Sequence, residues 1–276
     1  MRLVDTHSHI HDREFDADRA ATIERARDAG VEAIVMLAVT AANSRLAIEL
    51  AERHRQVFAA AGVHPHDAKD ASDADLDALE ELARHPHVVM VGEIGLDFYR
   101  NLSPRDTQIR VFRRQLKTSA RVSKPVAIHA REAHSSMLPL MEDWSREMRG
   151  ALPDGRLLGV MHYFSGDAAL ALRYIELGFV ISVHTSVTHP KAAQLAGVVR
   201  QVPLEHLVLE TDSPYGAPQS HRGKRNEPAY VAAAAEKVAE IKGIPVEDVG
   251  ETTTANALEL LGLAIAASTA AGKDGR

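Results

Sequence analysis

Short apolar runs recur along the chain, and most are followed by a stretch in which apolar positions recur with helical spacing. The first run leads into a helical stretch from Asp16, a plausible N-cap, to Gly30, a plausible C-cap. This order of strand and helix then repeats. We expect strands at 2–6, 33–37, 57–63, 88–92, 125–128, 157–161, 179–183 and 207–209. We expect helices at 16–30, 43–54, 72–85, 103–122, 134–149, 166–177 and 190–199, and two closing helices between 226 and 262.

The polar residues after these runs distinguish a closed barrel from an open doubly wound sheet. In a (β/α)8 barrel the carboxyl ends of all strands lie on one rim, where the active sites of this fold are built. The pattern therefore predicts an α/β protein with a TIM barrel. Seven of the runs end at a histidine or an acidic residue, namely His7 with His9, His64, Glu93, His129, His162, His184, and Asp212 just after Glu210.

The chain length suits one barrel-sized domain. It has 276 residues, of which 45% are hydrophobic, and no Pro/Gly/Ser-rich linker divides it. The last residues are small and polar, which is typical of a frayed end. We expect a single barrel domain over 1–263 and a flexible C-terminal tail over 264–276.

Composition and charge exclude several classes of site and of location. The absence of cysteine excludes disulfides and thiolate ligands, so a metal would be held by imidazole and carboxylate. The net charge of -6 argues against a broad basic face, so a nucleic acid would have to be gripped locally. Arg2 and Asp5 leave no room for a signal peptide, and no run reaches the length of a membrane span. We expect a soluble cytoplasmic monomer that does not contact membranes.

The histidines and acids at the strand ends form a possible metal site. If the first strand is extended, His7 and His9 lie on the same side of it, because side chains alternate with a period of two. Taken alone, Glu93 could pair with an arginine and His162 could be a packed histidine. Together, four imidazoles and two carboxylates form a ligand set for two divalent cations. The implied reaction is hydrolysis, with Asp212 as the base that accepts a proton from water.

Candidates for substrate binding come from a basic segment and from single residues on the expected rim. Residues 221–228 are the densest positive patch in an acidic chain, and they either form a solvated loop or bind phosphate. His64 could contact a phosphate or only hydrogen-bond a neighbour. Few aromatic side chains are available for stacking on bases, and Tyr99 and Phe164 are the candidates. The candidate substrate-binding residues are His64, Arg131, Arg222, Lys224 and Arg225.

Seven stretches also match a known family in their order and spacing. They are Asp5–His9, Gly62–His66, Gly92–Asp97, His129–Ala133, His162–Gly166, Glu210–Tyr215 and His221–Pro228. Together they resemble the ordered motifs of the TatD family of metal-dependent DNases, and the correspondence runs from Val4 to about Leu261. Several motifs in the right order make this resemblance far more specific than a single His-x-His pair.

The resemblance implies a metallo-dependent hydrolase barrel of the amidohydrolase superfamily with two divalent ions, Mg²⁺, Mn²⁺ or Zn²⁺. By position, His7, His9 and Asp212 would hold one ion and His129 and His162 the other, with Glu93 bridging them. The family's activity is DNA hydrolysis, with exonuclease action on single strands, so the expected partner is a single-stranded DNA end. The chain departs from the family pattern at His184, where a small residue is expected, and His189 follows it. These histidines could reshape the pocket or bind a further ion.

Two other functions fit parts of the pattern. The same metal centre serves amidohydrolases, so hydrolysis of an amide or ester bond is the alternative enzyme activity. In that case the basic segment 221–228 should be dispensable. A binding module that retains a structural metal is a third possibility, but the complete ligand set argues against it because catalytic metals keep an open site.

Overall fold

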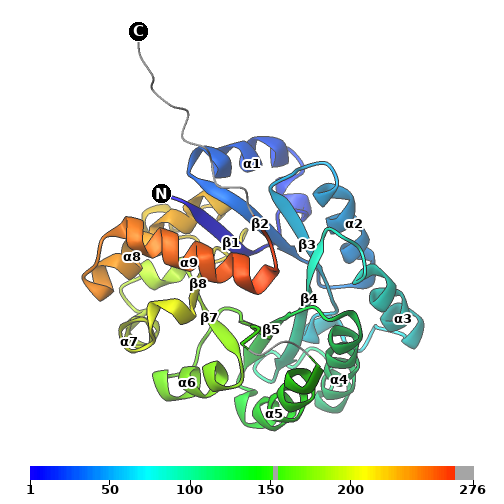
Figure 1. The fold of residues 1–276 in the computed structure, drawn as a ribbon. Helices are drawn as coiled ribbons and strands as arrows, with labels where there is room; N and C mark the ends of the chain where they lie inside the picture. The colour runs from blue at the N-terminus through cyan, green and yellow to red at the C-terminus, as the bar shows by residue number, and fades with distance from the viewer. Residues whose placement is uncertain (152–154, 265–276) are drawn as a thin grey trace.

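The computed structural model describes residues 1–151 and 155–264. Its eight strands form one parallel sheet in which each strand pairs with the next along the chain, and helices surround it (Figure 1). The strands are β1 (Leu3–Ser8), β2 (Val31–Leu37), β3 (Val57–Ala61), β4 (Val88–Asp97), β5 (Val126–Arg131), β6 (Gly159–Met161), β7 (Phe179–His184) and β8 (Leu207–Glu210). The helices are α1 (Arg19–Asp28), α2 (Ala41–Ala51), α3 (Asp73–Leu82), α4 (Arg105–Val122), α5 (His134–Ala151), α6 (Ala168–Glu176), α7 (Ala193–Gln201), α8 (Val231–Lys242) and α9 (Val246–Leu261).

Contacts between the first and the last strand close the sheet into a barrel. The hydroxyl of Thr6 donates to the carbonyl of Leu209 at 3.0 Å. Farther along, the Asp212 N–H donates to the His7 carbonyl at 2.9 Å, and the His9 N–H donates to the Ser213 carbonyl at 2.7 Å. The predicted (β/α)8 barrel is therefore confirmed.

Apolar side chains fill both the space inside the barrel and the space between strands and helices. Alternation along each strand sends one set inward and the next outward. The inner cluster contains Val4, Val89 and Val208, and Leu260 of α9 packs against it. The last helix thus covers the amino-terminal end of the barrel (Figure 1).

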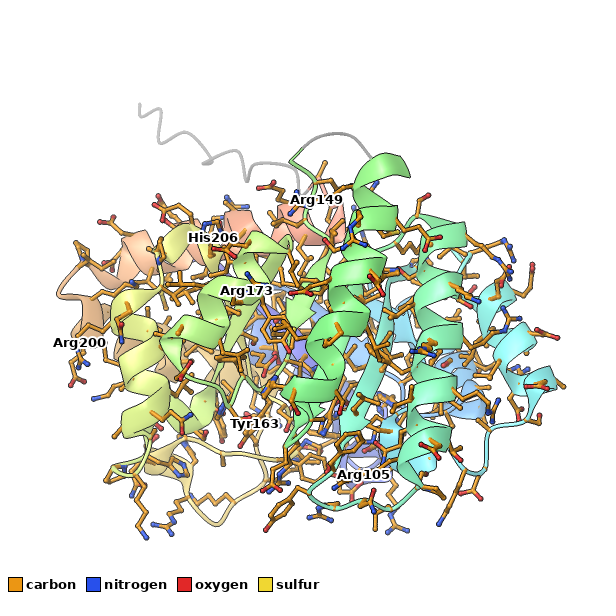
Figure 2. All side chains as sticks on the ribbon, turned by 90° about the horizontal axis from the view of Figure 1, so that it is seen from below. Arg105, Arg149, Tyr163, Arg173, Arg200 and His206 are labelled. Atoms are coloured by element: carbon orange, nitrogen blue, oxygen red, sulfur yellow. The ribbon has the colours of Figure 1, made fainter. Side chains whose placement is uncertain are left out.

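A view at right angles shows which end of the barrel carries the polar rim. Tyr163 follows β6 and Arg105 begins α4, and both lie toward one end of the molecule (Figure 2). Arg149 at the end of α5 and His206 before β8 lie toward the other end (Figure 2). The segments that follow the strands therefore share one rim, as the fold requires.

Two local predictions were wrong. Asp16 does not cap a helix, because 13–15 form a 3-10 turn and α1 begins only at Arg19, whose guanidinium binds the Ile10 carbonyl at 2.7 Å. The strand predicted at 88–92 continues to Asp97. Gly95 makes this possible, since its φ is +145° and a Cβ there would lie 2.0 Å from the His129 carbonyl oxygen.

The expected tail falls, apart from Ala264, outside the described residues. Among the helices that the structure describes, none is long and apolar enough to cross a membrane.

Candidate metal centre

The carboxyl ends of the strands surround a cavity of about 650 Å³. All six predicted metal ligands are near one another here, although His7 lies beneath the surface of the cavity and does not line it. Arg131 lines the cavity, as does His64. The lining residues are His9, Asp12, Val39, His64, His66, Asp67, Glu93, Arg100, His129, Ala130, Arg131, His162, Tyr163, Ser165, Asp212 and Tyr215.

One group of donors joins β1 to the segment after β8. The Nε2 atoms of His7 and His9 are 3.2 Å apart, and the Asp212 Oδ1 atom lies 3.7 Å from the first and 3.5 Å from the second. The Nδ1 atom of His9 donates to the Leu37 carbonyl at 2.8 Å, which leaves its Nε2 atom directed at the cluster. These three residues match the set that the sequence predicts for one ion.

The charges in this group favour the binding of a cation, because the Asp212 carboxylate is ionised. Burial lowers the pKa of His9, but the hydrogen bond and the charge of Asp212 outweigh it and raise the pKa to about 9. Burial raises the pKa of Asp212, yet the hydrogen bond from His9 and the nearby histidines hold it below its ordinary value. Asp212 is therefore an anion, and it has a φ of 58°, in the left-handed region that an Asp tolerates better than most residues.

Glu93 lies at the centre of the cluster. Its carboxylate oxygens lie 2.9 Å from His129 Nδ1, 3.3 Å from His7 Nε2, 3.5 Å from His64 Nε2 and 3.6 Å from His162 Nε2. Burial raises its pKa, but the charges of the surrounding histidines and the hydrogen bond from His129 hold the pKa well below its ordinary value. An anionic carboxylate whose Oε2 atom faces His7 and whose Oε1 atom faces His129 can bridge two cations.

His162 is oriented by a carboxylate behind it. Its Nδ1 atom lies 3.0 Å from Glu210 Oε1, which also accepts the Tyr163 N–H at 2.8 Å. The imidazole stacks on His7 with a centroid separation of 3.4 Å. Glu210 therefore turns the Nε2 atom of His162 toward Glu93, which is the usual arrangement behind a metal-binding histidine.

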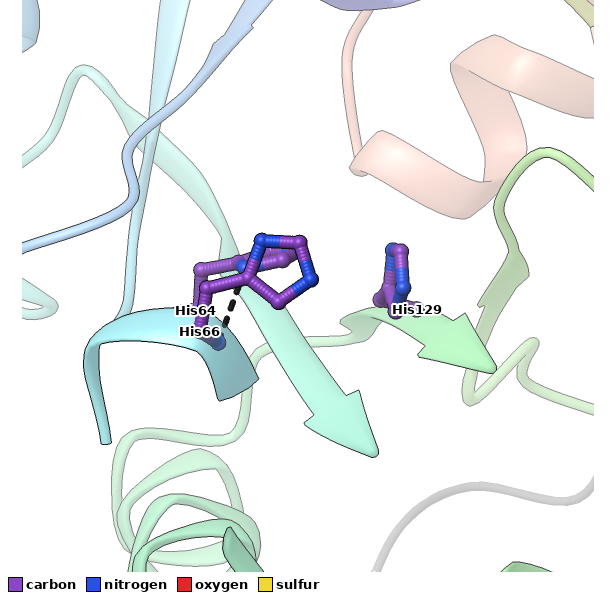
Figure 3. Close-up of side chains that lie close together, drawn as sticks. All are labelled: His64, His66 and His129. Atoms are coloured by element: carbon purple, nitrogen blue, oxygen red, sulfur yellow. Dashed lines mark hydrogen bonds between the residues drawn. The ribbon is translucent and has the colours of Figure 1, made fainter. Parts of the chain in front are cut away.

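A second group of donors lies on the other side of Glu93. His64 and His66 stand on the turn after β3, a 3-10 helix over Pro65–Asp67, and face His129 on β5 (Figure 3). The backbone N–H of His66 donates to His64 Nδ1 at 3.1 Å (Figure 3). Asp97 Oδ2 lies 2.7 Å from His66 Nε2 and 3.2 Å from His129 Nε2.

The roles of His66 and Asp97 were not predicted from the sequence. A signal for Asp97 was present, because Glu93, Gly95 and Asp97 alternate along one strand and so share a side. The pattern predicts this strand only to Gly92, five residues before Asp97. A third residue without a predicted role is Asp5, whose carboxylate accepts both the N–H and the hydroxyl of Thr211 and so fixes the segment that carries Asp212.

The chemistry of the donors fits divalent cations. Within the described part of the chain, the ion-pair partners of Glu93 and Asp212 are histidines, with no lysine or arginine among them. Because its Nδ1 atom donates to the Leu37 carbonyl, a neutral His9 presents the lone pair of its Nε2 atom to the cluster, where a cation can bind it. Imidazole and carboxylate suit Zn²⁺ and Mn²⁺, and less readily Mg²⁺.

Only some of the predicted substrate-binding residues lie at the cavity. His64 and Arg131 line it, whereas Arg222, Lys224 and Arg225 do not. Arg225 is turned away, since its guanidinium binds the Asp18 carboxylate at 2.7 and 2.8 Å and lies over the Phe15 ring. Arg225 is paired within the fold because the chain after β8 folds back onto α1, and its part in substrate binding stays a prediction. Arg222 and Lys224 are exposed on the same loop.

The two additional histidines lie behind the cavity wall. His184 is buried and stacks on Tyr163 with a centroid separation of 3.6 Å, so it supports one wall of the pocket. His189 Nε2 donates to the Ala217 carbonyl at 2.8 Å. Of the two stacking candidates, Phe164 is buried and Tyr99 is exposed.

The chain is similar over nearly its whole length to known proteins. A model of the family described as TatD related DNase matches residues 4–262. The metal-dependent hydrolase YabD of Bacillus subtilis (strain 168) is 37% identical, over 94% of this chain and 98% of that protein. A protein of Citrobacter koseri named 3'-5' ssDNA/RNA exonuclease TatD is 34% identical, over 95% of this chain and 100% of that protein. The crystal structure of YjjV, a TatD homolog of Escherichia coli K12, superimposes with a TM-score of 0.88 at 30% identity, over 95% of this chain and 99% of that one.

Proposed function

We propose that this chain, which belongs to the TatD family of metal-dependent hydrolases, cleaves phosphodiester bonds of DNA at the ends of single strands. The observation that carries the proposal is the buried, anionic Glu93 at the centre of histidine ligands in an open cavity. Its relatives include proteins named 3'-5' ssDNA/RNA exonuclease, which supports a nucleic-acid substrate.

We assign the metal ligands as the sequence predicts. His7, His9 and Asp212 would hold one ion, His129 and His162 the other, and Glu93 would contact both. When bound, two divalent ions supply a water that ionises near neutral pH and neutralise charge on a phosphate. The chain's part is to orient the donors through Glu210, Asp97 and the Leu37 carbonyl.

We propose that Asp212 accepts a proton from the attacking water. Its pKa lies below its ordinary value, so the carboxylate is free of a proton at neutral pH. The side chain is 14% exposed, more than that of Glu93, and it lines the cavity. The hydrogen bond from its N–H to the His7 carbonyl fixes its position relative to the cluster. A base needs this reach and this protonation state.

Basic side chains at the mouth would hold the phosphate. Arg131 and Arg100 line the cavity, and His64 lies 3.5 Å from Glu93, close to the assigned ions. The exposed Arg222 and Lys224 stand farther out and would contact the strand beyond the scissile phosphate. Because the rest of the chain is acidic, this local group is the part that attracts a polyanion.

The test is cleavage of an end-labelled single-stranded oligonucleotide by chelator-stripped protein, with Mg²⁺, Mn²⁺ or Zn²⁺ added back. We expect stepwise shortening by the wild type and a loss of at least about 100-fold in Asp212→Asn, because the variant lacks the base. Asp28→Asn, which changes a carboxylate that is 76% exposed on the outer surface, is the matched control. Full activity in Asp212→Asn would overturn the assigned role.

The same protein preparations separate this function from the alternative. If no oligonucleotide is shortened with any metal while amide or carboxylic ester substrates turn over in a metal-dependent way, the amidohydrolase activity replaces the nuclease. A monomeric, cytoplasmic enzyme stays a prediction, which gel filtration and cell fractionation would check.

A further inference from the structure

We infer that Arg131 and Tyr99 form a platform on which a base of the substrate strand stacks at the edge of the cavity. The inference rests on the proposed function, and it adds a site for the base to a centre that acts on the phosphate. The platform is the guanidinium of Arg131, backed by the ring of Tyr99, with its other face turned to the ligand.

The two side chains are held together by the register of the sheet. Asp97 at the end of β4 pairs with Arg131 at the end of β5, and the Phe98 N–H donates to the Arg131 carbonyl at 2.9 Å. The segment that follows β4 therefore runs beside Arg131. The Cζ atom of Arg131 lies 3.9 Å from the centroid of the Tyr99 ring, within the range of a cation–π contact.

The ring of Tyr99 is exposed but its backbone is fixed. The residue as a whole is 57% exposed. Asp97 Oδ1 accepts the N–H of Tyr99 at 3.0 Å and that of Arg100 at 2.7 Å. The same carboxylate binds His66 and His129 through its other oxygen. The platform is thus tied directly to the metal centre.

Arg131 is free to contact a ligand. Among the residues that the structure describes, no carboxylate lies within ion-pair distance of its guanidinium and no acceptor takes its N–H groups. An arginine that only clamps a phosphate needs no aromatic support. One whose guanidinium lies over a ring has a second face that can contact a ligand, and such faces stack on unpaired bases of any sequence.

The other side of the cavity carries a second exposed ring. Tyr215 is 56% exposed and lines the cavity three residues after Asp212. Its ring stands edge to face with His9, at a centroid separation of 6.2 Å. Because this ring contacts a histidine of the metal centre, a change at Tyr215 would also disturb His9, so the test uses Tyr99 and Arg131.

The experiment asks whether the effect of changing Tyr99 or Arg131 depends on a base being present in the substrate. Oligonucleotides with a tetrahydrofuran abasic residue at the last or next-to-last position are compared with the complete strand, for wild type, Tyr99→Leu, Tyr99→Phe and Arg131→Lys. We expect Tyr99→Leu to lower kcat/KM on the complete strand about tenfold, and Arg131→Lys to do the same because it keeps charge but loses the plane. On one of the abasic strands, the loss should shrink to about twofold. Tyr99→Phe should restore cleavage, since a ring is what the platform needs.

A binding measurement makes the result independent of catalysis. In an Asp212→Asn background, fluorescence anisotropy with a labelled oligonucleotide gives Kd for the same strands. Tyr99→Leu and Arg131→Lys should again weaken binding more for the complete strand than for the abasic strand. Leu102→Ala, on the same loop and 49% exposed, controls for disturbance of the loop. Equal losses on complete and abasic strands, or no loss in Tyr99→Leu, would overturn the platform. If coupled binding is seen but the wild type cleaves nothing, the platform stands and the proposed nuclease fails.

Discussion

At the scale of single residues, Asp97 illustrates how much of the site depends on groups that do not bind the ions themselves. Its buried carboxylate holds His66, His129 and the loop that bears Tyr99. We expect Asp97→Asn to weaken metal binding or cleavage by about 10- to 100-fold. An asparagine has only one oxygen in place of two, and its NH₂ group would face a histidine N–H that now donates to the carboxylate. Titration of stripped protein with Mn²⁺ by calorimetry, beside oligonucleotide cleavage, measures both effects.

The matched control is Asp143→Asn, an exposed carboxylate on α5 whose ion-pair partner, among the residues that the structure describes, is Arg146. If Asp97→Asn binds Mn²⁺ and cleaves the oligonucleotide as well as this control, the contacts of Asp97 with His66 and His129 are not needed for metal binding or for the reaction.

The same scale shows what the sequence could supply about the site and what it could not. Alternation along an extended segment was enough to place His7 and His9 together, and their Nε2 atoms are indeed 3.2 Å apart. The position of Arg225 depended on where a loop folds back, and its pairing with Asp18, 207 residues earlier in the chain, left no local signal. Local periodicity predicts neighbours within an element, whereas partners distant in sequence follow only from the completed fold.

At the scale of elements, helix α3 carries the clearest local stabilisation. Ser72 accepts the Asp75 N–H at 3.2 Å, and the Asp75 carboxylate accepts the Ser72 N–H at 3.0 Å, which forms a capping box. We expect Ser72→Ala to lower the free energy of unfolding by about 1 kcal/mol, since a helix N–H loses its acceptor. Urea denaturation measures the change, and cleavage should be unaffected because α3 lies on the outside of the barrel.

Ser135→Ala is the control for this change. Ser135 is exposed in the first turn of α5 and, among the described residues, its hydroxyl has no hydrogen-bond partner. A loss in Ser135→Ala as large as that in Ser72→Ala would mean that the capping box adds nothing.

The order of elements was predictable, and their ends were not. Apolar runs bounded by turn residues located all eight strands, and helical spacing located the helices between them. The ends depended on contacts that cross the chain. β4 runs five residues past its predicted end because Gly95 lets the strand pass the His129 carbonyl, and α1 begins late because Arg19 is drawn to the Ile10 carbonyl.

At the scale of the whole molecule, closure of the barrel is what assembles the site. The six assigned ligands come from β1, β4 and β5 and from the segments after β1, β6 and β8, so no two neighbouring elements could form the cluster alone. The hydrogen bonds between the segments of His7 and Asp212 are also those that join the first strand to the end of the sheet. Metal binding and folding are therefore coupled, because in the unfolded chain the side chains that would bind the ions are far apart.

This coupling predicts that metal removal lowers stability. A cation that binds only the folded state at about 100 times its Kd adds about 2.7 kcal/mol, or roughly 5 to 10 °C in Tm for a chain of this size. We expect this rise when Mn²⁺ is added to stripped wild-type protein in a thermal melt. In Glu93→Gln the rise should fall to less than about 2 °C, since the central carboxylate that faces both groups of histidines has lost its charge. An equal rise in Tm in both proteins would mean that the stabilising ion binds elsewhere on the molecule. The cluster around Glu93 would then not be the metal site.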